Sequence, residues 1–271
     1  MIYKTIRLVV FLSLLFVPIQ LLAQTAPAQI NLDGFDAFVE KVMKDWKVPG
    51  LSLAIVKDGK IVYAKGYGFR DVAKKLPVTP DTLFAIGSNS KSFTAAALGI
   101  LADEGKLDFD KPVREYLPDF RLYDEYATAN LRVRDLVSHQ SGLPRHDLLW
   151  YGSPLSRKEL FDRLRYLEPS RKLHEKYQYN NLMFMTAGVL VERLSGMSWE
   201  EFIAKRIFEP LAMKTSNTSV NTSKRSADFA LPYAETKGEL KEIPFRNIDA
   251  IGPAGSINSS VNEMSNWLAM Q

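Results

Sequence analysis

The chain has 271 residues, of which 46% are hydrophobic and 24% are charged, a composition typical of a soluble globular protein with a sizeable core. A formal charge of +4 is too small to indicate a nucleic-acid-binding surface. The absence of cysteine excludes disulfides, thiol nucleophiles and thiolate metal sites. The three histidines lack metal-ligand spacing, so we expect neither a metal nor another cofactor.

Residues 1–23 have the pattern of a secretory signal peptide. Lys4 and Arg7 form a basic start, and an almost wholly apolar run over 8–22 follows. Leu21-Leu22-Ala23 offers residues small enough for cleavage before Gln24. We therefore expect a protein that is exported and is secreted or periplasmic.

An uncleaved N-terminal anchor helix is the alternative, and Pro18 and the cleavage site argue against it. Residues 24–31 are interpreted as a linker, and residues 32–271 as the folded domain. No later run is apolar for long enough to cross a bilayer, so we expect no stable membrane span after cleavage.

The first half of the domain begins with a helix and a hairpin. Apolar residues recur at helical spacing over 32–46. Two β-rich runs follow at 51–56 and 61–67, and the Asp58-Gly59 pair between them is a strong hairpin signal.

The rest of the chain is mostly helical in pattern. Residues 215–241 are polar and poor in strand signals, so we expect them to meander. The expected helices cover 88–104, 133–138, 157–167, 182–194, 199–208 and 261–271.

The main chemical feature is the sequence Ser88-Asn89-Ser90-Lys91 at the start of a predicted helix. Residues three apart share a helix face, so the hydroxyl of Ser88 and the amine of Lys91 can meet. A serine nucleophile needs a neighbouring base, and burial lowers the pKa of a lysine enough for that role. Ser-x-x-Lys also occurs by chance, where the serine caps the helix and the lysine is solvated.

Tyr179-Asn180-Asn181 gives the pair a context. In an extended segment entering a helix, Tyr179 and Asn181 point to the same side and would face a common cleft. A phenol beside a cationic lysine can carry protons to a leaving group, and the Asn181 amide can bind a substrate carbonyl. The alternative is a capping asparagine with a tyrosine in the core.

These segments resemble the class C β-lactamase, D-alanyl-D-alanine carboxypeptidase and penicillin-binding-protein superfamily. The resemblance extends over nearly all of 32–271 and keeps the motifs in order. It is carried by 50–59, 79–84, 86–94, 104–107, the Leu136-Val137-Ser138-His139-Gln140-Ser141-Gly142-Leu143-Pro144 segment and Pro253-Ala254-Gly255-Ser256.

The resemblance implies an α+β fold, with an antiparallel sheet flanked by helices and a mostly helical lobe. It also implies a covalent acyl-enzyme route, in which Ser88 attacks a carbonyl while Lys91 and Tyr179 transfer protons. An oxyanion hole would include the backbone N–H of Ser88.

The third motif of such enzymes, K-T-G or H-x-G on a late strand, is not found after Gly255. Lys214-Thr215-Ser216 and Lys237-Gly238 come too early in the chain. We therefore expect a chain truncated at its C-terminus, with the last sheet strands missing and an unpaired edge on the sheet. A natural short form is the alternative.

The histidines are weaker candidates. His146 is a candidate for the rim of the substrate pocket, and His139 is expected to be a structural hydrogen-bonding residue. A Ser-His-Asp triad using His139 or His174 would be unusual, because the chain has no G-x-S-x-G elbow.

The sequence thus predicts a serine hydrolase of the cell envelope, with Ser88, Lys91 and Tyr179 as catalytic residues and Asn181 and His146 in substrate binding. The expected substrate is a D-amino-acid peptide, a β-lactam or an ester, with no nucleic-acid partner. A non-catalytic penicillin- or peptidoglycan-binding homologue is the alternative, motivated by the absent third motif. The sequence does not indicate an oligomeric state.

Overall fold

The structure is a computed structural model that describes residues 31–271. The expected signal peptide and nearly all of the expected linker lie outside the described residues. The helices are α1 (Phe35–Asp45), α2 (Ser90–Asp103), α3 (Val113–Tyr116), α4 (Glu125–Asn130), α5 (Val133–Leu136), α6 (Arg157–Arg163), α7 (Asn181–Ser195), α8 (Trp199–Ile203), α9 (Val220–Ser223), α10 (Gly252–Gly255) and α11 (Val261–Met270). The strands are β1 (Gly50–Lys57), β2 (Lys60–Asp71), β3 (Leu76–Pro77), β4 (Phe84–Ala85), β5 (Tyr233–Thr236), β6 (Glu239–Glu242) and β7 (Asn258–Ser259).

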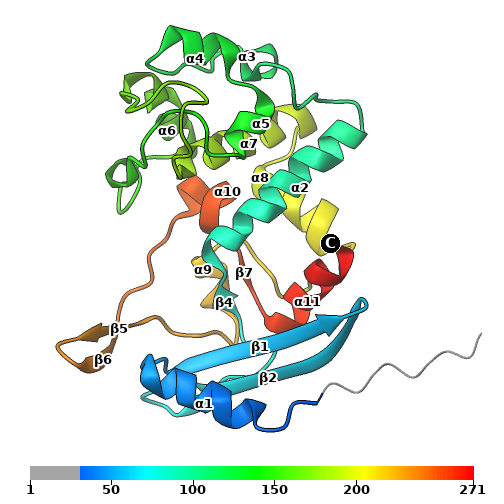
Figure 1. Cartoon of the computed structure of the whole chain (residues 1–271), viewed down its shortest axis with the longest axis vertical. Coiled ribbons are helices and arrows are strands. Elements are labelled where there is room, and N and C mark those ends of the chain that lie inside the picture. The colour runs from blue at the N-terminus through cyan, green and yellow to red at the C-terminus, as the bar shows by residue number, and fades with distance from the viewer. Residues whose placement is uncertain (1–30) are drawn as a thin grey trace, which may run out of the picture. The chain divides into compact units, whose positions relative to one another are not determined.

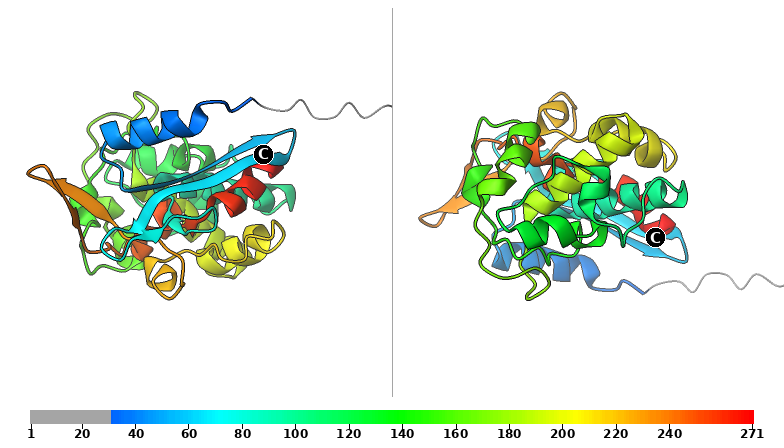
Figure 2. Two further views of the ribbon diagram at one scale, coloured as in Figure 1. Left: turned by 90° about the horizontal axis from the view of Figure 1, so that it is seen from below. Right: turned by 90° about the horizontal axis from the view of Figure 1, so that it is seen from above.

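The predicted hairpin is confirmed by β1 and β2, which pair antiparallel from Gly50↔Gly68 to Lys57↔Lys60. Asp58 and Gly59 form the two-residue turn with φ of 51° and 69°, the left-handed conformation that such hairpin turns require. Helix α1 packs on one side of the hairpin and α11 on the other (Figure 2).

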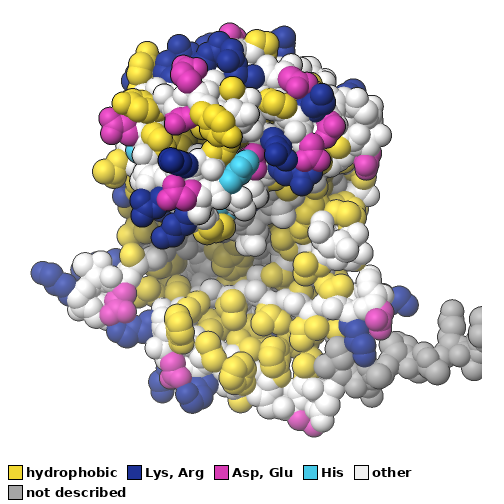
Figure 3. Space-filling model, turned by 45° about the horizontal axis from the view of Figure 1, so that its top comes forward, with side chains coloured by type: hydrophobic (Ala, Val, Ile, Leu, Met, Phe, Trp, Pro, Cys, Tyr) yellow, Lys and Arg dark blue, Asp and Glu magenta, His cyan; other side chains and the backbone are white. Residues whose placement is uncertain are grey.

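The main sheet has the order β1-β2-β3, so β1 lies at its edge. In the part of the chain that the structure describes, no strand pairs with the outer side of β1. Hydrophobic side chains gather over this sheet region, beside a hollow that separates it from the helical lobe (Figure 3).

The helical lobe is built around α2 and α7, which contact each other along their buried faces (Figure 1). Phe93, Leu98 and Leu101 of α2 are fully buried in the core, and Phe93 stacks on Trp267 of α11 at a ring-centroid distance of 3.9 Å. That stack connects the helical core to the helix that covers the sheet. Together, the sheet and the lobe confirm the expected α+β fold.

Several predicted helices are shorter than expected or change type. The helix predicted over 88–104 begins with a 3₁₀ turn at Gly87–Asn89 before α2. The helix predicted over 199–208 becomes a π-helical turn at Ala204–Phe208. No helix among residues 31–271 has both the length and the apolar character needed to cross a bilayer.

The prediction that 215–241 is poor in strands was wrong. Strands β5 and β6 form an antiparallel hairpin there, and Lys237-Gly238 is its turn, with φ of 53° and 85°. The hairpin strands are largely exposed, so they lack the apolar alternation that identifies a half-buried strand. Lys237 therefore belongs to a surface turn.

Candidate active site

Ser88 lies in the first turn of the helical segment that continues as α2. Gly87 has a φ of 53°, a left-handed conformation that lets the chain turn sharply into the helix. Lys91 follows one turn later, and its Nζ donates to the Oγ of Ser88 at 3.1 Å. The two side chains meet as their spacing predicted.

Tyr179 and Asn181 reach the same point from the start of α7. Tyr179 donates its phenolic hydrogen to the Oγ of Ser88 at 2.5 Å, and Asn181 Oδ1 accepts from Lys91 Nζ at 2.8 Å. Asn180, between them, caps α7 by accepting from the N–H of Met183 at 3.0 Å. The cap fixes where the helix begins, and the flanking side chains then reach Ser88, in the case of Tyr179, and Lys91, in the case of Asn181.

Lys91 is 7% exposed and has an acceptor for each of its three possible N–H bonds. The third acceptor is the carbonyl of Ala254 in α10, at 2.7 Å. Helix α10 can lie close because Gly188 of α7 has no side chain, and a Cβ there would be 2.1 Å from Pro253 Cγ. Burial lowers the pKa of Lys91, which a base near neutral pH requires.

The Tyr179 ring is enclosed by cationic and aromatic groups. His139 packs on it with a centroid distance of 4.4 Å, and the Arg145 guanidinium lies 5.0 Å from its centroid. Desolvation raises the pKa of Tyr179, but Lys91, the hydrogen bond to Ser88 and the charge of Arg145 outweigh it, so the net pKa is lowered. The phenol therefore gives up its proton more readily than a free tyrosine does.

Asp147 is a site residue that the sequence reasoning missed. Its Oδ1 accepts from Asn181 Nδ2 at 3.3 Å and from Trp150 Nε1 at 3.1 Å. Its Oδ2 forms an ion pair with Arg145 Nε at 2.6 Å. The only signal in the sequence that could have found it is its position just after the Gly142-Leu143-Pro144 landmark.

Within residues 31–271, none of the three histidines is hydrogen-bonded to Ser88. His139 Nδ1 accepts from the backbone N–H of Asn180 at 3.1 Å, and burial together with the charges of Lys91 and Arg145 lowers the pKa of His139. His174 Nε2 lies 2.9 Å from Asp135 Oδ2. Among the described residues, Ser88 Oγ is hydrogen-bonded only to Lys91 and Tyr179, so this geometry contains no Ser-His-Asp triad.

His146 does not join the hydrogen bonds around Ser88. Its Nε2 lies 3.2 Å from the carbonyl oxygen of Glu168. Its backbone has a φ of 49° at the start of a short 3₁₀ turn, Asp147–Leu149. His146 thus lies directly before the turn that contains Asp147. Its assignment to substrate binding stays a prediction.

Lys214-Thr215-Ser216 has a structural role. The backbone N–H groups of Thr215 and Ser216 donate to the Glu263 carboxylate at 2.8 and 2.7 Å, which ties this segment to α11. It therefore does not supply the third motif to Ser88.

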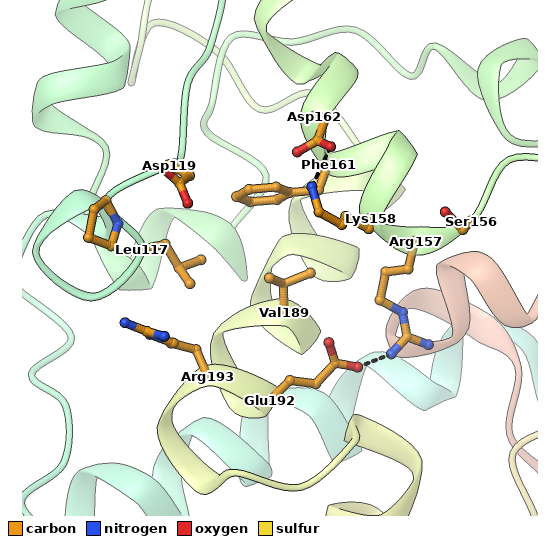
Figure 4. Close-up of a pocket in the computed structure, with 11 residues that line it drawn as sticks. Leu117, Asp119, Ser156, Arg157, Lys158, Phe161, Asp162, Val189, Glu192 and Arg193 are labelled. Atoms are coloured by element: carbon orange, nitrogen blue, oxygen red, sulfur yellow. Dashed lines mark hydrogen bonds and ion pairs between the residues drawn. The ribbon is translucent and has the colours of Figure 1, made fainter.

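A cavity of about 690 Å³ lies between the end of α3, α6 and α7 (Figure 4), and its lining does not include Ser88, Lys91, Tyr179 or Asn181. Arg157 forms ion pairs there with Glu192 and Glu200. Arg157 also donates to the carbonyls of Asp249 and Ala250, just before α10. The cavity is thus separate from the site, and Arg157 connects its wall to the segment that precedes α10 and Ala254.

A Ser-x-x-Lys helix start that meets a Tyr-x-Asn entry, on this α+β scaffold, is the arrangement of the β-lactamase-fold serine hydrolase family. The chain belongs to the Beta-lactamase family, whose model matches residues 35–271.

Curated relatives include unguisins hydrolase ungD′ of Aspergillus campestris, which is 33% identical over 245 residues covering 86% of this chain and 46% of that protein. Protein flp of Staphylococcus aureus is 27% identical over 243 residues, covering 87% of this chain and 48% of that protein. The chain spans about half the length of these curated relatives.

Among solved structures, the octameric penicillin-binding protein homologue from Pyrococcus abyssi has a TM-score of 0.80 at 33% identity, covering 89% of this chain and 56% of that one. A class C β-lactamase from Rhodobacter sphaeroides has a TM-score of 0.70 at 24% identity, covering 88% of this chain and 64% of that one, which shows likeness of fold.

Proposed function

We propose that the whole protein is a serine hydrolase that forms a covalent acyl-enzyme at Ser88 with an amide or ester substrate. The observation that carries the proposal is the convergence of two proton-transferring groups on one hydroxyl. Ser88 Oγ lies 3.1 Å from Lys91 Nζ and 2.5 Å from Tyr179 Oη. A serine nucleophile needs a base within hydrogen-bond distance, and the leaving group later needs a proton from that base.

The reaction requires that the Lys91–Tyr179 pair has already lost one proton. Ser88 Oγ then bonds to the substrate carbonyl carbon, and its proton passes to the pair. When the bond from that carbon to the leaving group breaks, the pair returns the proton to the leaving atom. Water attacks the acyl-enzyme in the second half, which restores Ser88 and releases the acid.

The start of the helical segment supports the developing oxyanion. The backbone N–H of Ser88 and the positive end of the helix dipole favour negative charge beside Ser88. The resemblance assigns a second donor to a third motif that these 271 residues do not contain. The activity that we propose is therefore that of the whole protein.

The candidate substrates are D-amino-acid peptides, β-lactams and simple esters of the cell envelope. A hydrolase among the relatives, unguisins hydrolase ungD′, supports hydrolysis as the reaction class. A homologue that binds penicillin or peptidoglycan without turnover is the second candidate, motivated by the absent third motif.

Labelling the whole protein with a fluorescent fluorophosphonate and a fluorescent penicillin tests the proposal. We expect a covalent adduct on Ser88 that the Ser88→Ala variant cannot form. Ser92→Ala is the matched control, because Ser92 is an exposed serine one turn further along the same helix. An adduct that survives Ser88→Ala would overturn the proposal, and an adduct that forms but never turns over would favour the binding homologue.

We also propose export with cleavage after Ala23, supported by the basic and apolar pattern of residues 1–23. Mass spectrometry of the protein secreted by the native host would then find a mature chain that begins at Gln24. A chain that retains Lys4 and Arg7 would contradict this.

A further inference from the structure

A groove of about 370 Å³ lies directly beside Tyr179 and is lined by several positively charged side chains. Its lining includes Arg145, Arg171, Lys176 and Tyr179, together with Ser170 and Gln178, and it includes no acidic residue. The groove thus brings three cationic side chains to the side of the nucleophile that the phenol occupies.

Two of the three cations have weak or no counter-charges. The charge of Arg145 is balanced by Asp147 at 2.6 Å. Arg171 has only a distant partner, Glu175, at 3.7 Å, and its side chain is about half exposed. Lys176 forms no ion pair within residues 31–271 and is exposed. The groove therefore has positive charge available for a ligand.

The walls of the groove are held in place by backbone contacts between two loops. The carbonyl of Gly142 accepts from the N–H groups of Ser170 and Arg171 at 3.1 and 3.2 Å. Gly142 has a φ of 82°, and a Cβ there would lie 2.3 Å from the carbonyl oxygen of Arg171. Gln178 closes the ring by donating from Nε2 to Ser170 Oγ at 2.7 Å. Such a frame fixes the backbone of the groove before a ligand binds, so little backbone entropy is lost on binding.

We propose that this groove binds an anionic group on the leaving-group part of the substrate, with Arg171 and Lys176 as its charge contacts. The inference rests on the proposed function, because the phenol that returns the proton must face the leaving atom. Tyr179 is both that phenol and the wall of the groove. A leaving group with a carboxylate or a phosphate places its negative charge beside the two cations.

Three acetyl esters separate the possibilities: phenyl acetate, 3-acetoxybenzoate and 3-acetoxyphenyl phosphate. The first is neutral, and the others differ from it by one carboxylate or one phosphate on the leaving phenol. The whole protein should show a lower KM for the anionic esters, and the preference should shrink as salt is added. The anionic ester with the larger preference identifies the group that the site accepts.

The double variant Arg171→Gln, Lys176→Gln should raise KM for the preferred anionic ester by about tenfold and leave phenyl acetate within about twofold. Lys172→Gln is the matched control, since Lys172 is an exposed cation of the same loop outside the groove. Equal KM values for the three esters, or an unchanged KM in the double variant, would overturn the inference while leaving the hydrolase proposal intact.

Calorimetric binding of 3-hydroxybenzoate to the Ser88→Ala protein tests the groove without turnover. We expect binding that the double variant loses and the control variant keeps. If no ester is hydrolysed but this binding is observed, the groove assignment stands and the proposed function fails. If 3-hydroxybenzoate and 3-hydroxyphenyl phosphate both fail to bind, the groove assignment is wrong.

Discussion

Asp147 Oδ1 accepts a hydrogen bond from Asn181 Nδ2 at 3.3 Å, which leaves the opposite end of the same amide, Oδ1, facing Lys91 Nζ at 2.8 Å. A carboxylate accepts only, so it fixes which end of the amide faces the lysine. Asp147 thereby positions Lys91 through Asn181, without touching Ser88 itself.

Replacing Asp147 with alanine should therefore lower kcat toward a neutral ester by about 10²-fold while KM changes little, because the loss is one of alignment. The kcat of Asp147→Asn should lie between that of Asp147→Ala and that of the unchanged protein. The asparagine can still accept the hydrogen bond from Trp150, but it lacks the charge that holds Arg145. Steady-state kinetics with the exposed Asp103→Asn as control checks this. A rise in KM at constant kcat would instead place Asp147 in substrate binding.

Tyr179→Phe removes the hydroxyl and keeps the ring that packs on His139. We expect kcat to fall by about 10²- to 10⁴-fold, the usual contribution of a positioned proton donor. The free energy of unfolding should hardly change, because the stacked ring remains. Tyr166→Phe, at an exposed tyrosine away from the site, is the control for both measurements. Full activity in Tyr179→Phe would contradict this role, because Lys91 alone would then transfer the proton.

The pH profile follows from the shared proton of Lys91 and Tyr179. Activity needs the pair with one proton removed, so kcat/KM should rise as pH rises. The pKa of Lys91 is lowered mainly by burial, and that of Tyr179 is lowered despite desolvation. The midpoint should therefore lie below the value of about 10 that is usual for either side chain.

The same profile in Tyr179→Phe gives an internal check. Tyr179 raises the pKa of Lys91, so its removal should shift the midpoint measured with phenyl acetate to lower pH. A profile whose midpoint lies at the usual value for a free lysine would contradict a buried, depressed amine.

Two glycines should respond in opposite directions to alanine. At Gly99, inside α2, a Cβ would have no neighbouring atom within 4 Å, so Gly99→Ala should raise the free energy of unfolding by about 0.5–1 kcal/mol. At Gly66 in β2, a Cβ would lie 2.1 Å from the carbonyl oxygen of Val78, and Gly66→Ala should cost about 1–3 kcal/mol. Urea unfolding of both variants measures the difference. A change of the same sign in the free energy of unfolding of both variants would contradict this packing.

Local patterns predicted the parts of the fold that have a strong period or a distinctive turn. The Asp58-Gly59 hairpin and the helix now seen as α7 are of this kind, and so is the spacing that brings Lys91 to Ser88. The hairpin of β5 and β6 could not be predicted in this way, because its exposed strands bury no apolar face.

The contacts between distant segments were also beyond local patterns. Asp147 is separated from Asn181 by 34 positions, and Ala254 from Lys91 by 163. Such pairings depend on how helices pack, which the spacing of residues within one helix does not encode. The cationic groove has the same origin, because it forms only where the loop of Arg145 meets the loop of Arg171.

The open side of β1 affects how this polypeptide behaves in a concentrated solution. Gly50–Lys57 presents a row of backbone donors and acceptors that no strand among residues 31–271 uses. Two molecules can align such rows antiparallel and merge their sheets, a route by which strand edges promote self-association. The average molar mass that light scattering measures for the 271-residue chain should therefore increase with concentration. A proline placed at Ser52, whose N–H points away from β2 in this register, should suppress that increase.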